Sequence, residues 1–184
     1  LLFAALTFGC GQSKHIRQSL DRASSIMNEQ PDSARAILAN MERSALKSRA
    51  LRARHALLYS QALDKCYVDT DNDSLTSVAL DYYKSHGTDH EKALAYFYNA
   101  RVKIYGVQPT EEIIENFIAA QHYAENTDDT HLKGLLCFYI GKLYYKQLSI
   151  EEALDNFDKA ATYFEEINHR RNLMLSLQYK GICQ

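Results

Sequence analysis

Phe-Ile-Ala-Ala-Gln-His-Tyr at residues 117–123 is followed by Phe-Asp-Lys-Ala-Ala-Thr-Tyr at residues 157–163, a shift of 157 − 117 = 40 positions. Nearly the same shift separates Ala100, Gly141 and Gly181, which lie 41 and 40 positions apart. A fixed period in this range is typical of stacked helical hairpins, none of which buries its apolar face alone. The sequence therefore predicts an all-α stack of helix-turn-helix repeats, an α-solenoid with a period of about 40 residues.

The composition agrees with a helical domain and narrows the classes of partner. The chain has 184 residues, of which 46% are hydrophobic and 24% charged, enough for one domain with a core. The chain has only two prolines and seven glycines, the residues that most often break helices, and no segment has the pattern of a β-hairpin. The formal net charge of −2 gives no support for nucleic-acid binding.

Apolar spacing and turn residues place the helices along the chain. In the first expected helix, Ile16, Leu20, Ala23 and Met27 recur at intervals of 4, 3 and 4 and form one amphipathic face. The expected helices cover residues 13–29, a segment from 31, and 49–66, 73–85, 89–105, 110–126, 130–146, 149–167 and a segment from 170. Several starts carry capping chemistry, and Ser149 with Glu152 three residues later predicts a capping box.

The helix pair at 130–167 closely resembles a tetratricopeptide repeat. In that family the first helix carries a large residue, Leu, Gly and Tyr, and the second carries Ala, an aromatic residue and Ala. The matching positions here hold Cys137, Ile140, Gly141 and Tyr144, then Ala153, Phe157 and Ala160. All of them fit the pattern except Cys137. The small residues Gly141 and Ala153 predict a close approach of the two helices, with Phe157 and Tyr144 filling the gaps beside them.

The resemblance is strong over residues 134–166 and weaker over the rest of 15–184. In the preceding pair Phe117 and Ala120 match, whereas Ile113 stands for the small Ala and Ala100 for the Gly. The period also exceeds the 34 residues of that family, which implies longer helices or turns. The resemblance implies a right-handed superhelical stack of tetratricopeptide-like repeats over 15–184, continued by a cut-off fifth repeat.

The N-terminal segment resembles the end of a bacterial lipoprotein signal peptide. Residues 1–8 are largely apolar, too short for a bilayer span, and Gly9-Cys10 follows. Thr7 stands where the usual Leu of the lipobox would be. The interpretation is a signal-peptide end at 1–10, lipidation of Cys10 and a tether at 11–14. An ordinary signal peptide cleaved nearby, or a buried first helix, remains the alternative.

In the tetratricopeptide-repeat family the first helix of each pair lines the concave face, and this predicts where a partner binds. The corresponding residues mix tyrosines with cations, which suits a peptide with acidic and apolar side chains. Solvated residues and packing between repeats are the alternative explanation. The candidates are Arg54, Gln61, Asp64, Lys65, Phe97, Arg101, Tyr105, Phe138, Lys142, Tyr145 and Lys146.

Other constellations predict little chemistry. Asp69, Asp71 and Asp73 copy the start of a calcium loop, but Ser74 and Leu80 replace its Gly and its bidentate Glu. His86 and His90 have the spacing of helical metal ligands without a nearby third ligand. No nucleophile elbow, phosphate loop or dinucleotide fingerprint occurs, and the four cysteines form no short pair.

The sequence thus predicts a non-enzymatic protein-binding scaffold without a cofactor. It is expected to be anchored through Cys10 to a membrane of the bacterial cell envelope. The alternative is the sensory half of a signal-transduction or transcriptional regulator whose membrane-spanning and output domains lie beyond residue 184.

Overall fold

Helix-start chemistry explains where several helices begin. Ser48 accepts a hydrogen bond from the backbone N–H of Leu51 at the start of α3 (Arg49–Lys65), and Thr88 forms a capping box with Glu91 at the start of α5 (Asp89–Lys103). Pro31 occupies the first turn of α2 (Pro31–Ala39), where its missing N–H costs nothing. Ser149 precedes α8 (Ile150–Glu166), but its side chain makes no cap hydrogen bond, so the predicted capping box is wrong. Ser149 has φ −83° and ψ 77°, and Asp129 caps α7 (Thr130–Lys146) from nearly the same angles, φ −80° and ψ 79°, so the backbone conformation is not what prevents the cap.

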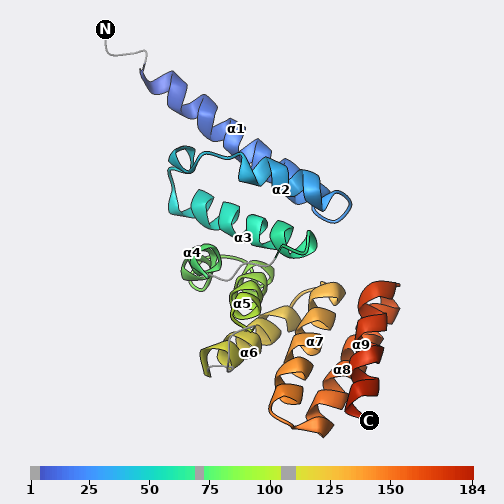
Figure 1. Cartoon of the computed structure of the whole chain (residues 1–184). Coiled ribbons are helices and arrows are strands. Elements are labelled where there is room, and N and C mark those ends of the chain that lie inside the picture. The colour runs from blue at the N-terminus through green and yellow to red at the C-terminus, as the bar shows by residue number, and fades with distance from the viewer. Residues whose placement is uncertain (1–4, 69–72, 105–110) are drawn as a thin grey trace. The chain divides into compact units, whose positions relative to one another are not determined.

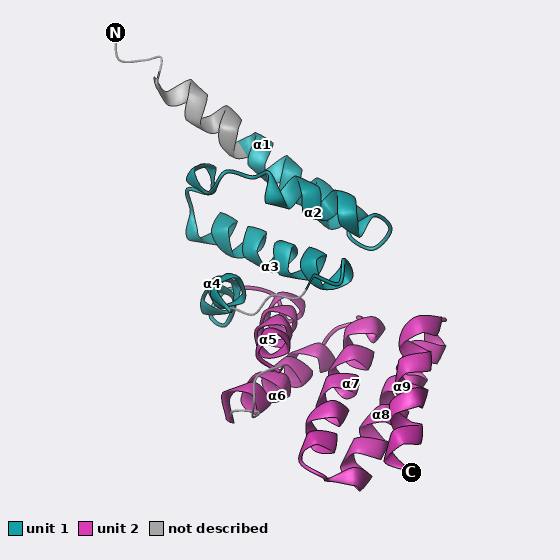
Figure 2. Ribbon diagram, in the orientation of Figure 1, with its two compact units in different colours: residues 1–86 teal, residues 87–184 magenta. Residues whose placement is uncertain are grey.

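The computed structural model describes residues 5–68, 73–104 and 111–184, with side chains from residue 14 onward. The chain divides into two compact units, residues 1–86 and 87–184 (Figure 2). The first contains α1 (Ala5–Ile26), α2 (Pro31–Ala39), a short 3-10 helix (Arg43–Ala45), α3 (Arg49–Lys65) and α4 (Ser74–Tyr83). The second contains α5 (Asp89–Lys103), α6 (Glu111–Glu125), α7 (Thr130–Lys146), α8 (Ile150–Glu166) and α9 (Arg170–Cys183). The described residues contain no strand, so the all-α class is confirmed for them.

The first unit is built on the amphipathic face that the sequence predicted. Ile16, Leu20 and Ala23 of α1, and Met27 directly after its end, are all buried in one cluster with Leu38 and other apolar residues of α2 and α3. The helix α1 also includes residues 11–14, for which the sequence predicted a tether. Cys10 belongs to the same helix, in a part whose side chains lie outside the described residues.

In the second unit each helix packs against the next one along the chain, and α7, α8 and α9 lie side by side (Figure 1). Phe157 of α8 is fully buried, and a Cβ placed on Gly141 of α7 would lie 2.9 Å from its Cε1 atom. The expected close approach at Gly141 is therefore confirmed. A second such contact joins Gly134 to Phe164, where the added Cβ would lie 2.7 Å from Cε1.

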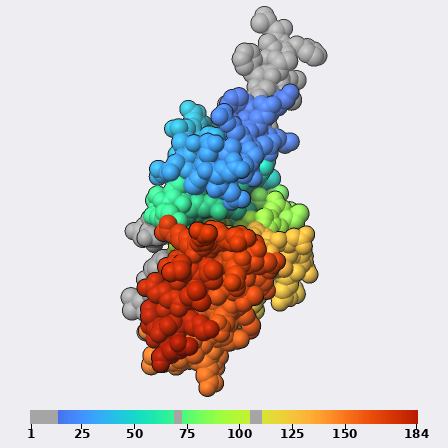
Figure 3. Space-filling model, turned by 90° about the vertical axis from the view of Figure 1, so that its right-hand side faces the viewer, coloured from blue at the N-terminus to red at the C-terminus, as the bar shows by residue number. Residues whose placement is uncertain are grey.

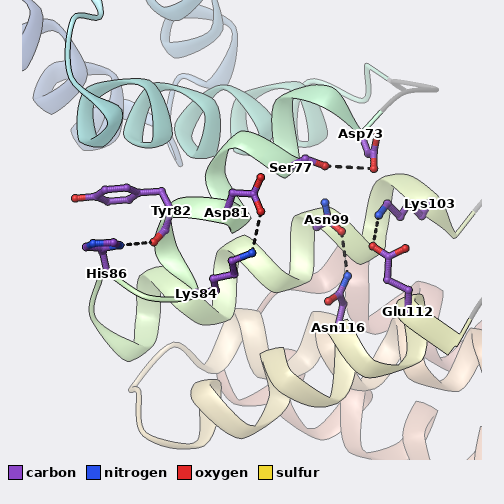
Figure 4. A network of polar contacts seen from close by, with 10 residues as sticks. All are labelled: Asp73, Ser77, Asp81, Tyr82, Lys84, His86, Asn99, Lys103, Glu112 and Asn116. Carbon is purple, nitrogen blue, oxygen red and sulfur yellow. Dashed lines mark hydrogen bonds and ion pairs between the residues drawn. The ribbon is translucent and has the colours of Figure 1, made fainter.

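Polar contacts join the first two helices of this unit. Asn116 of α6 donates a 3.0 Å hydrogen bond to the side-chain oxygen of Asn99 on α5, and both residues are buried (Figure 4). Lys103 and Glu112 form a more exposed ion pair between the same two helices (Figure 4). Two buried side-chain amides can form their hydrogen bond only at a few relative positions of the helices. The pair therefore restricts how α6 can slide along α5.

Three helices end in the same left-handed turn. After α3, α7 and α8, the residues Tyr67, Leu148 and Asn168 have φ values of 56°, 61° and 54°. Each turn closes with two backbone hydrogen bonds, such as Ser149 N–H to Tyr144 C=O at 3.0 Å. This is the Schellman arrangement, which glycine usually occupies because it has no Cβ to strain.

Replacing Leu148 by Gly is expected to raise the free energy of unfolding by about 1 kcal/mol, because it removes the strain of the left-handed conformation. The Leu148 side chain is 81% exposed, so little packing is lost. Denaturant titration would measure the change. The matched control is Leu177→Gly, because Leu177 is also exposed (46%) but lies inside α9, where glycine should destabilise. A loss of stability in Leu148→Gly would contradict the expectation.

Candidate functional site

The α7 helix carries the centre of the candidate site in the second unit. Phe138, Lys142 and Lys146 follow one another at intervals of four residues, so they lie along one face of that helix. Arg101 approaches from α5 and Tyr179 from α9. We refer to Arg101, Phe138, Tyr139, Lys142 and Tyr179 as the cationic-aromatic cluster. The structure thus brings together three of the predicted partner-binding residues, Arg101, Phe138 and Lys142.

The two cations of the cluster lie close to aromatic rings. The Lys142 Nζ atom is 5.5 Å from the ring centre of Tyr179, 5.6 Å from that of Tyr139 and 5.9 Å from that of Phe138. The Arg101 guanidinium carbon is 4.8 Å from the ring centre of Tyr139. Cations within about 6 Å of a ring centre are attracted by its negative face. The rings therefore help to hold two positive charges close together.

Electrostatics at Lys142 favour an anionic ligand. Burial lowers the pKa of Lys142, and the positive charges of Arg101 and Lys146 lower it further. These effects disfavour the charged ammonium, so a negative group placed beside it would be bound favourably. Lys146 also donates a 2.9 Å hydrogen bond to the backbone oxygen of Ile104. The arrangement offers the ammonium to a carboxylate and the half-buried Tyr179 ring to an apolar group, because Phe138 and Tyr139 are each only 8% exposed.

Tyr139 and Tyr179 belong to the cluster although they are not among the residues that the sequence predicted. Their spacing, 179 − 139 = 40 positions, equals the shift of the repeated stretch. This shift was therefore a signal in the sequence that could have identified them.

Phe97 is not accessible to a partner, so its prediction as a binding residue is wrong. Its side chain is fully buried between the rings of Phe117 and Tyr139, at centroid distances of 6.1 and 5.7 Å. Phe138 is also largely buried, with 8% of its surface exposed, so little of its ring is accessible to a partner. Tyr145 is half-buried on α7. Tyr105 lies outside the described residues.

The remaining candidates, Arg54, Gln61, Asp64 and Lys65, belong to α3 in the first unit and are half-buried. Arg54 forms a 2.6 Å ion pair with Asp21 of α1, so its charge is already matched within that unit. Binding of a partner at these four residues stays a prediction from the sequence.

The histidines and cysteines outside the cluster are bonded or buried within the fold. His90 forms a 2.9 Å hydrogen bond with Asp129, which raises the pKa of the His90 imidazole, and His86 bonds the backbone oxygen of Tyr82. Among the described residues, no group of three or more His, Cys, Asp or Glu side chains could hold a metal ion. Cys137 is buried, and burial raises the pKa of its thiol to about 11, which keeps it protonated and unreactive. Asp69 and Asp71 lie outside the described residues.

No helix in the described ranges is both long and apolar enough to span a membrane. The chain matches no protein-family model, no curated protein and no solved structure.

Proposed function

We propose that this chain is a non-enzymatic protein-interaction scaffold that binds a peptide with acidic and apolar side chains at the cationic-aromatic cluster. The observation that carries the proposal is the half-buried Lys142 ammonium among three aromatic rings, with Arg101 and Lys146 as its charged neighbours. A carboxylate of the peptide would pair with this ammonium, and an adjoining apolar side chain would pack on the half-buried Tyr179 ring.

The proposed architecture is a right-handed stack of tetratricopeptide-like repeats with a period of about 40 residues. Two observations support it. The helices α7 and α9 begin at Thr130 and Arg170, 40 positions apart, and within each unit successive helices pack on one another. In such a stack alternate helices share one face, as α5, α7 and α9 do when they contribute to the cluster.

A charge-reversal experiment tests the binding proposal. The probe is a labelled peptide of alternating Glu and Phe, compared with the same peptide carrying Gln in place of Glu. We expect Lys142→Glu to weaken binding of the Glu peptide at least about tenfold, measured by fluorescence anisotropy. The matched control, Lys159→Glu, makes the same change in net charge at a side chain of α8 that is 58% exposed and outside the cluster.

The control variant should bind the Glu peptide as the parent chain does, and circular dichroism would establish that both variants are folded. Equal binding of the Glu and Gln peptides, or equal losses in the two variants, would contradict a site at Lys142.

We further propose that Cys10 carries a lipid that anchors the chain to a membrane of the bacterial cell envelope. The support is the Gly9-Cys10 pair after an apolar run. The expected result in labelled bacterial cells is a mature chain that starts at Cys10 and carries acyl mass there, read by mass spectrometry. Cys10→Ser should abolish the acyl mass, whereas Cys183→Ser should retain it. A mature chain with an unmodified Cys10 would contradict the anchor.

A further inference from the structure

The positive charges of the chain are concentrated in its first third. Residues 14–54 contain nine Lys and Arg residues and four Asp and Glu residues, a formal net charge of 9 − 4 = +5. The whole chain has −2 and residues 1–13 carry no charged side chain, so residues 55–184 have −2 − 5 = −7. Such an asymmetry within one chain indicates that the basic part has a partner of opposite charge.

Six of these cations lie around the connection between α2 and α3. Leu46 in that connection is buried in one cluster with Ile16 and Leu20 of α1, so the connection packs against α1. Arg52 of α3 donates hydrogen bonds of 3.1 and 3.2 Å to the backbone oxygens of Leu46 and Lys47, which holds the start of α3 at the same place. We call these six cations the basic surface of the first unit: Lys14, Arg17, Arg43, Lys47, Arg49 and Arg52.

The basic surface keeps its charge for a partner. All six side chains are exposed, and none forms an ion pair with an acidic side chain that the structure describes. Asp21, the acidic residue of α1, is already paired with Arg54 at 2.6 Å. Glu42 lies beside the surface and accepts a 3.3 Å hydrogen bond from Ser44. Figure 3 shows α1, in blue, on the surface of the first unit.

The position of the basic surface along α1 is close to Cys10. Lys14 and Arg17 follow Cys10 by 4 and 7 positions in the same helix, a rise of about 6 Å and about 10 Å. The field of an anionic bilayer extends over about one Debye length, which is about 10 Å at an ionic strength of about 0.1 M. A chain attached to a bilayer at Cys10 would therefore hold both cations within reach of the lipid headgroups.

The composition of this region favours lipid over nucleic acid as the anionic partner. Residues 11–54 contain no Phe, Tyr or Trp on which a nucleobase could stack. Lipid headgroups need no such ring, because a bilayer attracts Lys and Arg side chains through its surface charge alone.

We propose that the basic surface of the first unit binds the anionic headgroups of a phospholipid bilayer and orients the chain on it. The choice of a membrane as the partner rests on the anchor proposed at Cys10. A single acyl chain gives only marginal membrane binding, and a polybasic surface is one way to add the second contribution that stable attachment needs. The surface is separate from the cationic-aromatic cluster and does not depend on peptide binding there.

Vesicle binding by the Cys10→Ser chain tests the basic surface without a lipid on the protein. We expect this chain to co-sediment with vesicles of phosphatidylglycerol and phosphatidylcholine, and at least about tenfold more weakly with vesicles of phosphatidylcholine alone. Added salt should weaken the binding, because it screens exposed charges. Every variant retains residues 1–9, so this apolar segment contributes equally to each comparison.

A triple variant locates the binding surface. Lys14→Gln, Arg17→Gln and Lys47→Gln together should weaken binding to the anionic vesicles at least about tenfold, because each cation near such a surface contributes about fivefold. The matched control makes the same change in net charge at three exposed cations outside the surface, with Lys84→Gln, Lys159→Gln and Arg170→Gln. The control should bind as the Cys10→Ser chain does, and circular dichroism would establish that both variants are folded.

Three results would overturn the proposal. Equal binding to the two kinds of vesicle would show that the charge of the lipids is not recognised. Equal binding by the triple variant and its control would place the contact elsewhere in the chain. Displacement of the chain from anionic vesicles by a DNA duplex at equal phosphate concentration would assign the basic surface to nucleic acid.

The anchor and the basic surface can fail separately. Acyl mass at Cys10 in labelled cells tests the anchor alone, and the Cys10→Ser chain tests the surface alone. Vesicle binding that the triple variant loses would support the basic surface even if Cys10 carries no lipid. Acylated Cys10 together with equal binding to both kinds of vesicle would support the anchor and overturn the basic surface.

Discussion

Replacing Phe157 by Ala is expected to lower the free energy of unfolding of residues 87–184 by about 3–5 kcal/mol, because it removes a large aromatic ring from the core. The Phe157 ring is fully buried, and its centroid lies 5.8 Å from that of Phe138 and 5.3 Å from that of Tyr179. Truncation leaves a cavity between α7, α8 and α9, which cannot collapse without moving helices that pack on other neighbours. Denaturant titration gives the free energy, and hydrogen exchange assigns the loss to these helices.

The matched control is Ile118→Ala, which removes an apolar side chain that is 60% exposed and should change stability by less than about 0.5 kcal/mol. Gly141→Ala makes the test sharper. Its Cβ would lie 2.9 Å from the Phe157 ring in the parent chain, so it should destabilise by about 1–3 kcal/mol. In the Phe157→Ala background the space is empty, and the same change should stabilise the helix by about 0.5–1 kcal/mol. A Gly141→Ala effect of equal size and sign in both backgrounds would contradict direct packing.

The contact between Gly141 and Phe157 could be predicted because it depends on residue size at fixed helical positions. The contact between Gly134 and Phe164 was missed, although the antiparallel arrangement of α7 and α8 implies it. Seven residues are about two helical turns, so the position seven before Gly141 meets the position seven after Phe157. Small residues that pair with aromatic residues at such intervals can therefore be read directly from the sequence.

The candidate site was predicted only in part, because exposure depends on which side of a helix its neighbours occupy. Arg101 and Lys142 were predicted to line one surface, and the structure places both near the Tyr139 ring, while their role in binding stays a prediction. Phe97 was assigned to the same surface but lies in the core, where a large apolar side chain gains most from burial. The repeat pattern placed Phe97 and Arg101 on the same face of α5. The packing of α5 against α6 and α7 buries Phe97 and leaves Arg101 in the cluster.

The spacing of capping residues in the sequence predicted the helix starts only in part. Thr88 with Glu91 has the spacing of a capping box and forms one, whereas Ser149 with Glu152 has the same spacing and does not. The N–H of Ser149 is part of the turn that ends α7, where it bonds the Tyr144 carbonyl. His169 holds the equivalent place after α8, where its N–H bonds the Phe164 carbonyl and its side chain still accepts a hydrogen bond from the Asn172 N–H. The turn that ends α7 therefore does not by itself explain why Ser149 makes no cap.

Replacing Asn116 by Leu is expected to lower the free energy of unfolding by about 1–3 kcal/mol, although leucine is similar in size and more apolar. Asn99 is 1% exposed and Asn116 7% exposed, so Asn99 would lose this hydrogen-bond donor where water cannot replace it. The double variant, with Leu at both positions, removes both polar groups and should recover most of the loss. Denaturant titration of the parent, the two single variants and the double variant gives the coupling energy.

Equal losses that add in the double variant would show that the two amides act independently, against the hydrogen bond in Figure 4. We expect the hydrogen bond also to fix the register of α5 on α6, because the buried residues of these helices include small ones, Ala100 and Ala120, that would tolerate a shift. The double variant should thus be nearly as stable as the parent chain but less uniquely packed. Broadened methyl and aromatic resonances around Phe117 in its NMR spectrum would report this loss. Sharp resonances at unchanged positions would show that the apolar contacts alone set the register.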